Sequence, residues 1–194
     1  MVTSDQKGRF MSNQRPALPA ADEIRQANSL FLHFLRSRPA LAVGQFGLSP
    51  RVTEILKQAD LEHIDQAADF PRALFRIRVP AECSAQDAQP VIEKDGSRQI
   101  LQATLFLSAW SICRMSGYAA RMLLRLDDDE VHRLRHAQMK DILQMSLNDN
   151  VMHAAFDDLD WIWNQLLTES RPECRQQLVL LGLQPGLSLG SFPR

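Results

Sequence analysis

Hydrophobic residues recur at helical spacing in the N-terminal half, and they predict four consecutive helices. From Asp22 to Arg36, apolar side chains return every three or four residues, so that they line one face of a helix. A short helix is expected over 41–45. Ser49 is a good N-cap and Pro50 suits the first helical position, so a third helix is expected to begin there. Asp60 introduces the fourth helix.

Beyond these helices the pattern changes twice. Over 73–79, apolar and basic residues alternate, and this period of two predicts a short strand or hairpin with Arg76 and Arg78 on one face. Prolines and an Asp-Gly pair mark 80–99 as a linker that can hold a small hairpin. From Ile100 the helical pattern resumes, apolar over much of the circumference, which predicts burial in the domain or against another chain.

A shift of 78 residues brings the two halves of the pattern into register. Ser49 falls on Asp127, which preserves a capping residue at a helix start. The apolar positions that coincide are Phe46 with Leu124, Leu48 with Leu126, Leu56 with Leu134, Ala59 with Ala137, Leu61 with Met139 and Ile64 with Ile142. Two unrelated amphipathic hairpins can also align in this way, but the gapless match favours a duplication. We therefore predict a mainly α chain in which two copies of one helical module form an intrachain pseudo-dimer.

The pattern divides the chain into five segments. We expect a disordered leader, a first module, a linker, a second module, and C-terminal helices with a flexible tail. Their expected bounds are 1–20, 21–80, 81–99, 100–156 and 157–194.

Composition limits the function classes. The formal net charge is −1, so no global field draws the chain onto DNA or an acidic membrane, and nucleic-acid contact needs a local patch or a basic partner. The three cysteines are far apart and form no CxxC, which argues against a zinc site made by this chain alone. Free thiols and the lack of a bilayer-spanning apolar run favour a cytoplasmic protein without a membrane anchor.

Catalytic chemistry is not expected. His132 and His136 are four residues apart on a predicted helix, and Asp129 is near, but too few further ligands converge for a metal enzyme. A solvated helix face explains this pair better. The chain contains no GxSxG, P-loop or dinucleotide motif. We therefore expect no enzyme, no metal and no cofactor.

The stretch Leu41-Ala42-Val43-Gly44-Gln45-Phe46-Gly47-Leu48-Ser49 resembles FlhD, a subunit of the bacterial flagellar master regulator. The apolar residues that follow it, and the ending 73–78, are also similar to that family and its short terminal strand. The resemblance covers 26–79 and, more faintly, 103–155. The FlhD subunit is a single module, whereas this chain has two, and Phe75 and His153 stand where the family strand carries a cysteine.

The resemblance implies a dimerising helical subunit that joins a zinc-bearing FlhC-like partner in a heteromeric activator. That complex binds promoter DNA and recruits RNA polymerase. A duplicated chain looks more like the activators of integrative and conjugative elements, which switch on transfer genes. This chain would be the subunit without the zinc site.

Two sets of residues are candidates for contacts. A helix-turn-helix over 50–68 would present Glu62 and Asp65 to the phosphates, so direct recognition by that helix is doubtful, and a packed hairpin is favoured. The candidate DNA-binding residues are instead Arg36, Arg38, Arg51, Arg76 and Arg78. The candidate partner-interface residues are Leu107, Trp110, Trp161 and Trp163. Trp161 and Trp163 fall on different faces of one helix, so we expect one ring in the core and the other at an interface.

A second hypothesis is an adaptor or secretion chaperone that joins proteins without touching DNA. Both hypotheses predict exposed apolar helix faces. The activator hypothesis also requires several of the five candidate arginines to share an open surface, whereas scattered or carboxylate-paired arginines favour the adaptor.

Overall fold

The computed structural model describes residues 19–80, 96–148 and 150–169, together with 171, 174, 177, 178 and 180. The linker with its expected hairpin, most of the leader and most of the C-terminal tail lie outside the described residues. The described part is mainly helical and contains one two-stranded sheet. None of its helices has both the length and the apolar character that crossing a bilayer requires.

The first half runs through four helices into a strand. Its elements are α1 (Pro19–Ser37), α2 (Pro39–Gly44), α3 (Pro50–Gln58), α4 (Leu61–Ala68) and β1 (Phe75–Ile77). The Ser49 side chain accepts a hydrogen bond from Val52 N, so it caps α3 as the sequence predicts. Helix α1 begins at Pro19 instead of Asp22, because proline is accepted in the first turn, where its missing N–H is not needed.

The second half repeats this order of elements. Its elements are α5 (Ser97–Met115), α6 (Gly117–Leu124), α7 (Asp128–His136), α8 (Met139–Ser146) and β2 (Met152–Ala154), and α9 (Asp160–Thr168) follows. Helices α5, α7 and α8 have the same lengths as α1, α3 and α4, and each begins 78 positions later. A capping box between Asp127 and Glu130 begins α7. Helix α5 starts at Ser97, inside the segment expected to be linker.

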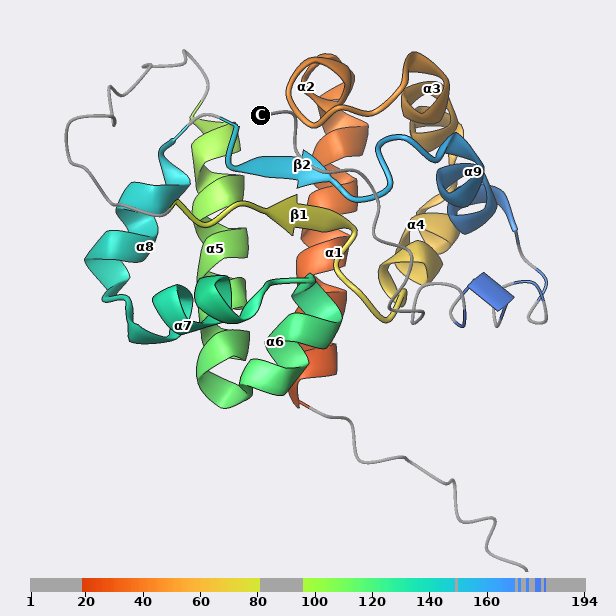
Figure 1. Cartoon of the computed structure of the whole chain (residues 1–194). Coiled ribbons are helices and arrows are strands. Elements are labelled where there is room, and N and C mark those ends of the chain that lie inside the picture. The colour runs from red at the N-terminus through yellow and green to blue at the C-terminus, as the bar shows by residue number, and fades with distance from the viewer. Residues whose placement is uncertain are drawn as a thin grey trace, which may run out of the picture.

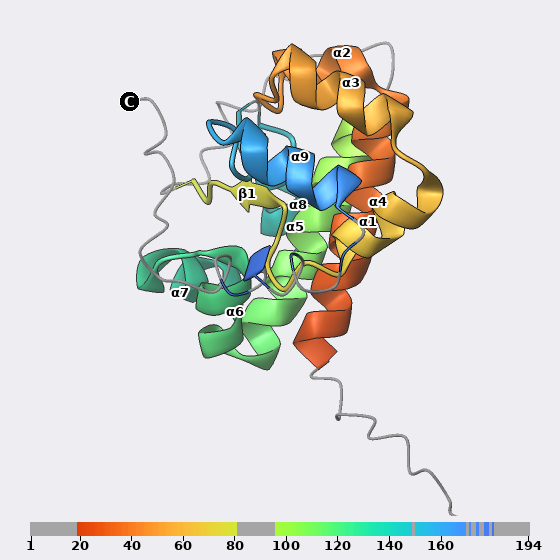
Figure 2. The ribbon, with the colours of Figure 1, turned by 90° about the vertical axis from the view of Figure 1, so that its right-hand side faces the viewer.

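The two long helices α1 and α5 stand side by side at the centre of the molecule (Figures 1 and 2). Helices α2, α3, α4 and α9 surround α1 on one side, and α6, α7 and α8 surround α5 on the other (Figure 1). The two strands cross the face of this central pair. They are antiparallel, and Arg76 faces His153 at the middle of the register. The strand β2 was not predicted from the sequence.

Two further backbone hydrogen bonds extend the strand pair. Arg78 N donates to Val151 O over 2.9 Å, and Ala155 N donates to Leu74 O over 2.8 Å. Each bond joins a residue just outside one strand to a residue just outside the other. The two halves of the chain are therefore joined by backbone hydrogen bonds at the centre of the molecule as well as by packed helices.

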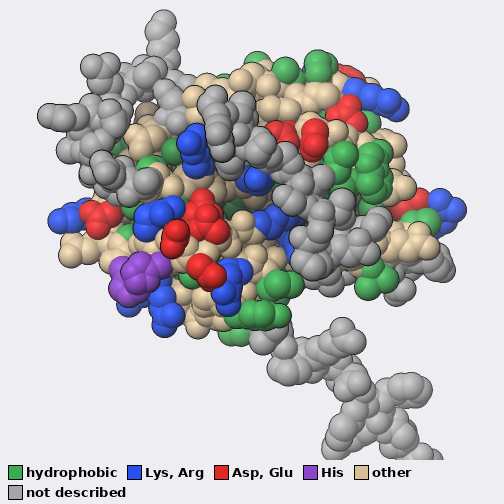
Figure 3. All heavy atoms as spheres, viewed as in Figure 1, with side chains coloured by type: hydrophobic (Ala, Val, Ile, Leu, Met, Phe, Trp, Pro, Cys, Tyr) green, Lys and Arg blue, Asp and Glu red, His purple; other side chains and the backbone are tan. Residues whose placement is uncertain are grey.

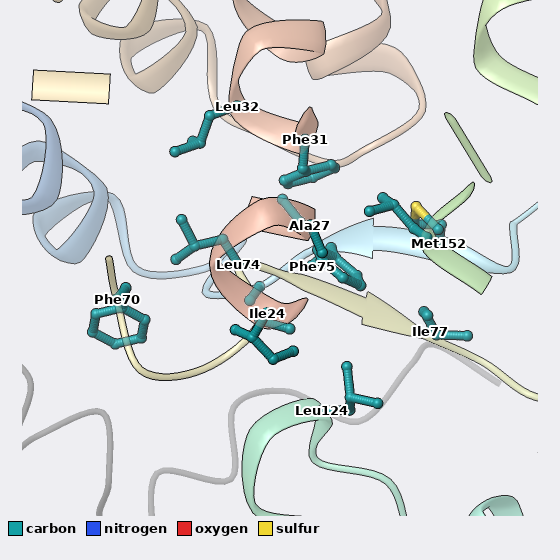
Figure 4. Close-up of a cluster of buried hydrophobic side chains, with 14 of the residues drawn as sticks. Ile24, Ala27, Phe31, Leu32, Phe70, Leu74, Phe75, Ile77, Leu124 and Met152 are labelled. Carbon is teal, nitrogen blue, oxygen red and sulfur yellow. The ribbon is translucent and has the colours of Figure 1, made fainter. Parts of the chain in front are cut away.

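One continuous apolar core fills both halves. The Phe31 ring of α1 lies 5.5 Å from Phe46 and 5.6 Å from Phe75, measured between ring centroids. Figure 4 shows Phe75 and Ile77 of β1 and Met152 of β2 turned toward this core, with Leu124 of α6 beneath. In each strand two buried residues flank a half-buried one, and this explains why short strands suffice here, since their alternate residues complete the core.

Candidate nucleic-acid and partner surfaces

The five candidate arginines lie on two groups of elements. Arg36 is in the last turn of α1, Arg38 is the N-cap of α2, and Arg51 is in the first turn of α3. Arg76 is the middle residue of β1, and Arg78 is exposed just beyond it. Helices α2 and α3 lie at one end of α1, whereas β1 crosses its middle (Figures 1 and 2). The candidates are thus divided between that end of α1 and the strands.

Two arginines that the sequence analysis did not select join Arg76. Arg72 precedes β1 and Arg125 follows α6, and their segments are held together by a 2.8 Å hydrogen bond from Ala73 N to Leu123 O. Arg72 is only 5% exposed. Burial lowers its pKa, as expected for a cation removed from water. No periodic signal in the sequence marks this convergence.

Arg125 has an unusual setting. Its backbone is left-handed, with φ of 59°, and its guanidinium carbon lies 4.2 Å from the centroid of the Phe156 ring. Its Nε atom is buried and has no hydrogen-bond partner. Burial, and after it the positive charges of Arg72 and Arg76, lower the pKa of Arg125 to about 10. The positive charges of Arg72 and Arg76 therefore act on Arg125.

Acidic and basic groups are interspersed beside this cluster. Glu130 of α7 accepts a hydrogen bond from Val79 N over 3.5 Å, and Arg133 donates to Val79 O over 3.4 Å. Burial raises the pKa of Glu130. In the space-filling view, blue side chains lie across the middle of the strand-bearing face, and red ones lie among those toward α7 (Figure 3). The face as a whole is mixed in charge.

Helices α1 and α4 form a groove of about 610 Å³ that is lined by both charged and apolar groups. Arg25 pairs with Asp69 over 2.7 Å, and His33 lies 3.6 Å from Asp65. Leu30 adds one exposed apolar side chain. These charged groups lie along the seam between the two helices and hydrate well.

The seam between α5 and α8 carries apolar residues where the α1–α4 seam carries polar ones. The positions 78 residues after Asp22, Ser29, Asp65 and Asp69 are Ile100, Leu107, Leu143 and Leu147. Ile100 is 69% exposed, Leu143 is 42% exposed and Leu147 is 40% exposed, and Leu107 is half-buried. Met139, one turn before Leu143 on α8, is exposed as well. Exposed apolar residues at this spacing form a stripe typical of a protein-binding helix face.

The three tryptophans have different surroundings. Trp163 is 1% exposed, and its Nε1 donates to Ala155 O over 2.9 Å, so it belongs to the core and has no surface for a partner. Trp161 is 46% exposed. Their placement on different faces of α9 follows the helical spacing. Trp110 is half-buried, its Nε1 donates to Ala137 O, and Arg114 lies over its ring.

The histidine pair is exposed on α7. The ring centroids of His132 and His136 are 4.2 Å apart, and Nδ1 of His136 lies 2.8 Å from His132 O. In the described part of the chain, no group of three or more His, Cys, Asp or Glu side chains is placed to hold a metal ion. Glu62 and Asp65 are exposed on α4, where they would repel phosphate.

Comparison with protein families, with curated proteins and with solved structures finds no match.

Proposed function

We propose that this protein is a tandem FlhD-like subunit of a heteromeric transcriptional activator that binds promoter DNA. The repeated order of helices and strand supports the duplication. Helices α1, α3 and α4 have the same lengths as α5, α7 and α8 and begin 78 residues before them. The repeat therefore includes whole helices as well as the local pattern of apolar residues. The antiparallel pairing of β1 with β2 is the contact that two such modules would make as a pseudo-dimer.

Corresponding buried positions support the same conclusion. Shifted by 78 residues, the buried residues Ala42, Phe46 and Leu48 fall on Ala120, Leu124 and Leu126, which are also buried. Gly47 and Arg125 correspond, and both have a positive φ. A left-handed residue between the second and third helices is a specific feature that periodic hydrophobicity alone does not require.

The apolar α5–α8 seam is the proposed binding surface for a zinc-bearing FlhC-like partner. The seam is defined by Ile100, Leu107, Met139, Leu143 and Leu147. The corresponding α1–α4 groove carries ion pairs instead. If the two modules share an origin, this difference means that only one of them kept or gained an apolar docking face.

Contact with DNA is proposed for Arg36, Arg38, Arg51, Arg76 and Arg78, through the phosphates. With a net charge of −1, the chain has no general attraction for DNA, so the arginines would act together with the partner's charges. The same proposal includes recruitment of RNA polymerase and control of the transfer genes of a conjugative element.

The adaptor hypothesis remains the second candidate, and one observation favours it. The arginines are divided between the end of α1 and β1, whereas the apolar seam residues lie on the neighbouring helices α5 and α8 and at the C-cap of α8. An adaptor or secretion chaperone would bind its partner through the seam, and its arginines would make no contact with DNA.

One experiment distinguishes the activator proposal from the adaptor hypothesis. The chain is co-expressed with an FlhC-like protein, and the product is tested in a mobility-shift assay with a promoter fragment at increasing salt. The activator proposal expects a co-purified complex that shifts the fragment and releases it steeply as salt rises. A complex that forms but leaves the fragment unshifted at low salt supports the adaptor. If the chain forms no complex with that partner, the activator proposal is wrong.

A further inference from the structure

We propose that the α5–α8 seam binds an amphipathic helix of a partner chain, and that acidic side chains border the apolar face of that helix. The seam residues are Ile100, Leu107, Met139, Leu143 and Leu147. The inference rests on the proposed function in taking the seam as the partner surface, and it deepens that function by stating the chemistry of the partner segment. It does not depend on the partner being FlhC-like.

The spacing of the seam residues matches one face of a helix. Helices α5 and α8 pack side by side (Figure 1). Met139, Leu143 and Leu147 recur every four residues along α8 and its C-cap, and Ile100 and Leu107 are seven residues apart on α5. At 1.5 Å per residue, the row on α8 is about 12 Å long. An amphipathic helix presents apolar anchors at i, i+4 and i+7 over nearly the same length, so its apolar face fits this seam.

The two helices of the seam carry almost no negative charge. Helix α5 contains no aspartate or glutamate. The one carboxylate of α8 is that of Asp141, and it caps its own helix by accepting a hydrogen bond from Gln138 N over 2.9 Å. An acidic partner segment therefore meets little repulsion from these two helices.

Two cations border the apolar residues of the seam. Lys140 is exposed on α8, three residues before Leu143, so the two side chains are neighbours on the helix surface. Arg114 is exposed on α5, seven residues beyond Leu107, and its guanidinium carbon lies 5.0 Å from the centroid of the Trp110 ring. Among the described residues, no carboxylate pairs with either cation. The complement of this border is a row of acidic side chains.

The first half of the chain shows that this pattern is not a general property of the module. Four seam positions, Ile100, Lys140, Leu143 and Leu147, correspond to carboxylates 78 residues earlier. Those carboxylates belong to Asp22, Glu62, Asp65 and Asp69. At matching positions, the second half therefore has apolar surface and a lysine where the first half has negative charge. This difference favours a partner that is apolar with an acidic border.

A second copy of this chain is a poorer occupant of the seam. Two copies that met seam to seam would place Lys140 and Arg114 of both at one interface. Like charges at an interface oppose association. We therefore assign the seam to a different chain.

The test compares the binding of two synthetic peptides to the full chain, measured by fluorescence anisotropy at low salt. Both peptides are alanine-based helices of about 18 residues with leucines at i, i+4 and i+7. They differ only in carrying glutamate or lysine at the positions that flank the leucines. The glutamate peptide should bind about tenfold more tightly than the lysine peptide, because it pairs with Lys140 and Arg114.

Charge reversal at the border tests the source of this preference. Lys140→Glu should remove most of the preference for the glutamate peptide, since it leaves one cation and one anion at the border. Lys57→Glu, the same change at an exposed position on α3, is the matched control and should keep the preference.

A change in the apolar row tests the other half of the inference. Leu143→Asp should weaken the binding of both peptides by about tenfold or more, because a buried apolar contact is lost. Leu61→Asp is the control and should leave both affinities unchanged, since Leu61 is exposed on α4, away from the seam.

A preference for the glutamate peptide that Lys140→Glu removes supports the inference, even if no FlhC-like protein co-purifies with the chain. Equal affinities for the two peptides, or binding of neither, overturn the inference even if such a protein does co-purify. A preference that Lys57→Glu also removes overturns it, because the charge dependence would then belong to the whole chain. Self-association that Leu143→Asp abolishes overturns it as well, since a second copy would then cover the seam.

Discussion

The Oδ1 atom of Asn28 accepts a hydrogen bond from Leu74 N over 2.8 Å, and this contact ties the centre of α1 to the start of β1. The Nδ2 atom of the same side chain donates to the carbonyls of Ala68, Phe70 and Arg72. One buried amide therefore satisfies four backbone groups of the turn between α4 and the strand. It fixes the path that brings Arg72 and Arg76 to their places.

Asn28→Ala should destabilise the fold by about 2–3 kcal/mol, because it leaves several buried backbone groups without a partner. Urea denaturation followed by circular dichroism measures the loss. Gln26→Ala, an exposed change in the same helix, is the control and should shift the unfolding free energy by less than about 0.5 kcal/mol. Equal effects of the two changes would show that the amide network contributes nothing.

Glu130→Gln should change the pH dependence of stability. Burial raises the pKa of Glu130 in the folded protein, so its contribution is fully present below the unfolded-state pKa. That contribution is lost as the pH rises through the folded-state pKa. Glutamine keeps an acceptor for Asp127 N and does not titrate.

The unfolding free energy of Glu130→Gln should therefore rise relative to that of the wild type between about pH 4 and pH 7. Chemical denaturation at several pH values measures the difference. Glu54→Gln, at an exposed position on α3, is the comparison. A difference that stays constant, or that falls as the pH rises, would contradict the assigned burial of Glu130.

Cys113 should resist alkylation in the folded protein. It is fully buried in α5, and burial raises the pKa of its thiol to about 12. Because the thiolate is the reactive form, labelling by iodoacetamide at pH 8 should be slower by about a thousandfold or more than in the unfolded chain. Peptide mapping by mass spectrometry reports the rate at this residue. Labelling at the unfolded-state rate would place Cys113 outside the core.

Leu143→Asp with Leu147→Asp should abolish co-purification with the partner and leave the fold stable, since both side chains are exposed, Leu143 on α8 and Leu147 at its C-cap. Charged groups on a docking face must be desolvated or repelled when the partner binds. Leu61→Asp is the matched control, because Leu61 is 57% exposed on α4, the corresponding helix of the first half. Retained binding in the double variant would move the interface away from the α5–α8 seam.

The helices were predictable because their signals are local. Each depends on apolar spacing and on caps such as Ser49 and Asp127, whose side chains do accept the expected backbone hydrogen bonds. The strand β2 was not predicted, because three residues carry little pattern and its pairing partner lies in the other half of the chain. Its place is set by tertiary contacts.

The candidate surfaces also include features that local spacing predicts and features that depend on tertiary contacts. The two faces of α9 follow from spacing alone, so the opposite placements of Trp161 and Trp163 could be foreseen, although which ring is buried could not. The meeting of Arg72 with Arg125 could not be foreseen. It depends on the hydrogen bond between Ala73 and Leu123, which joins segments that are distant in sequence.

The slope of DNA affinity against salt tests most directly the claim that this chain contacts promoter phosphates within the complex. The complex with the partner would be titrated against a promoter fragment, with wild-type chain and with Arg36→Gln, Arg51→Gln and Arg78→Gln combined. Each lost phosphate contact should reduce the slope of log Kd against log salt by about 0.9. We predict a shallower slope and weaker binding in the triple variant, and no change for Arg114→Gln. Identical slopes and affinities for the triple variant and the wild type would contradict the claim.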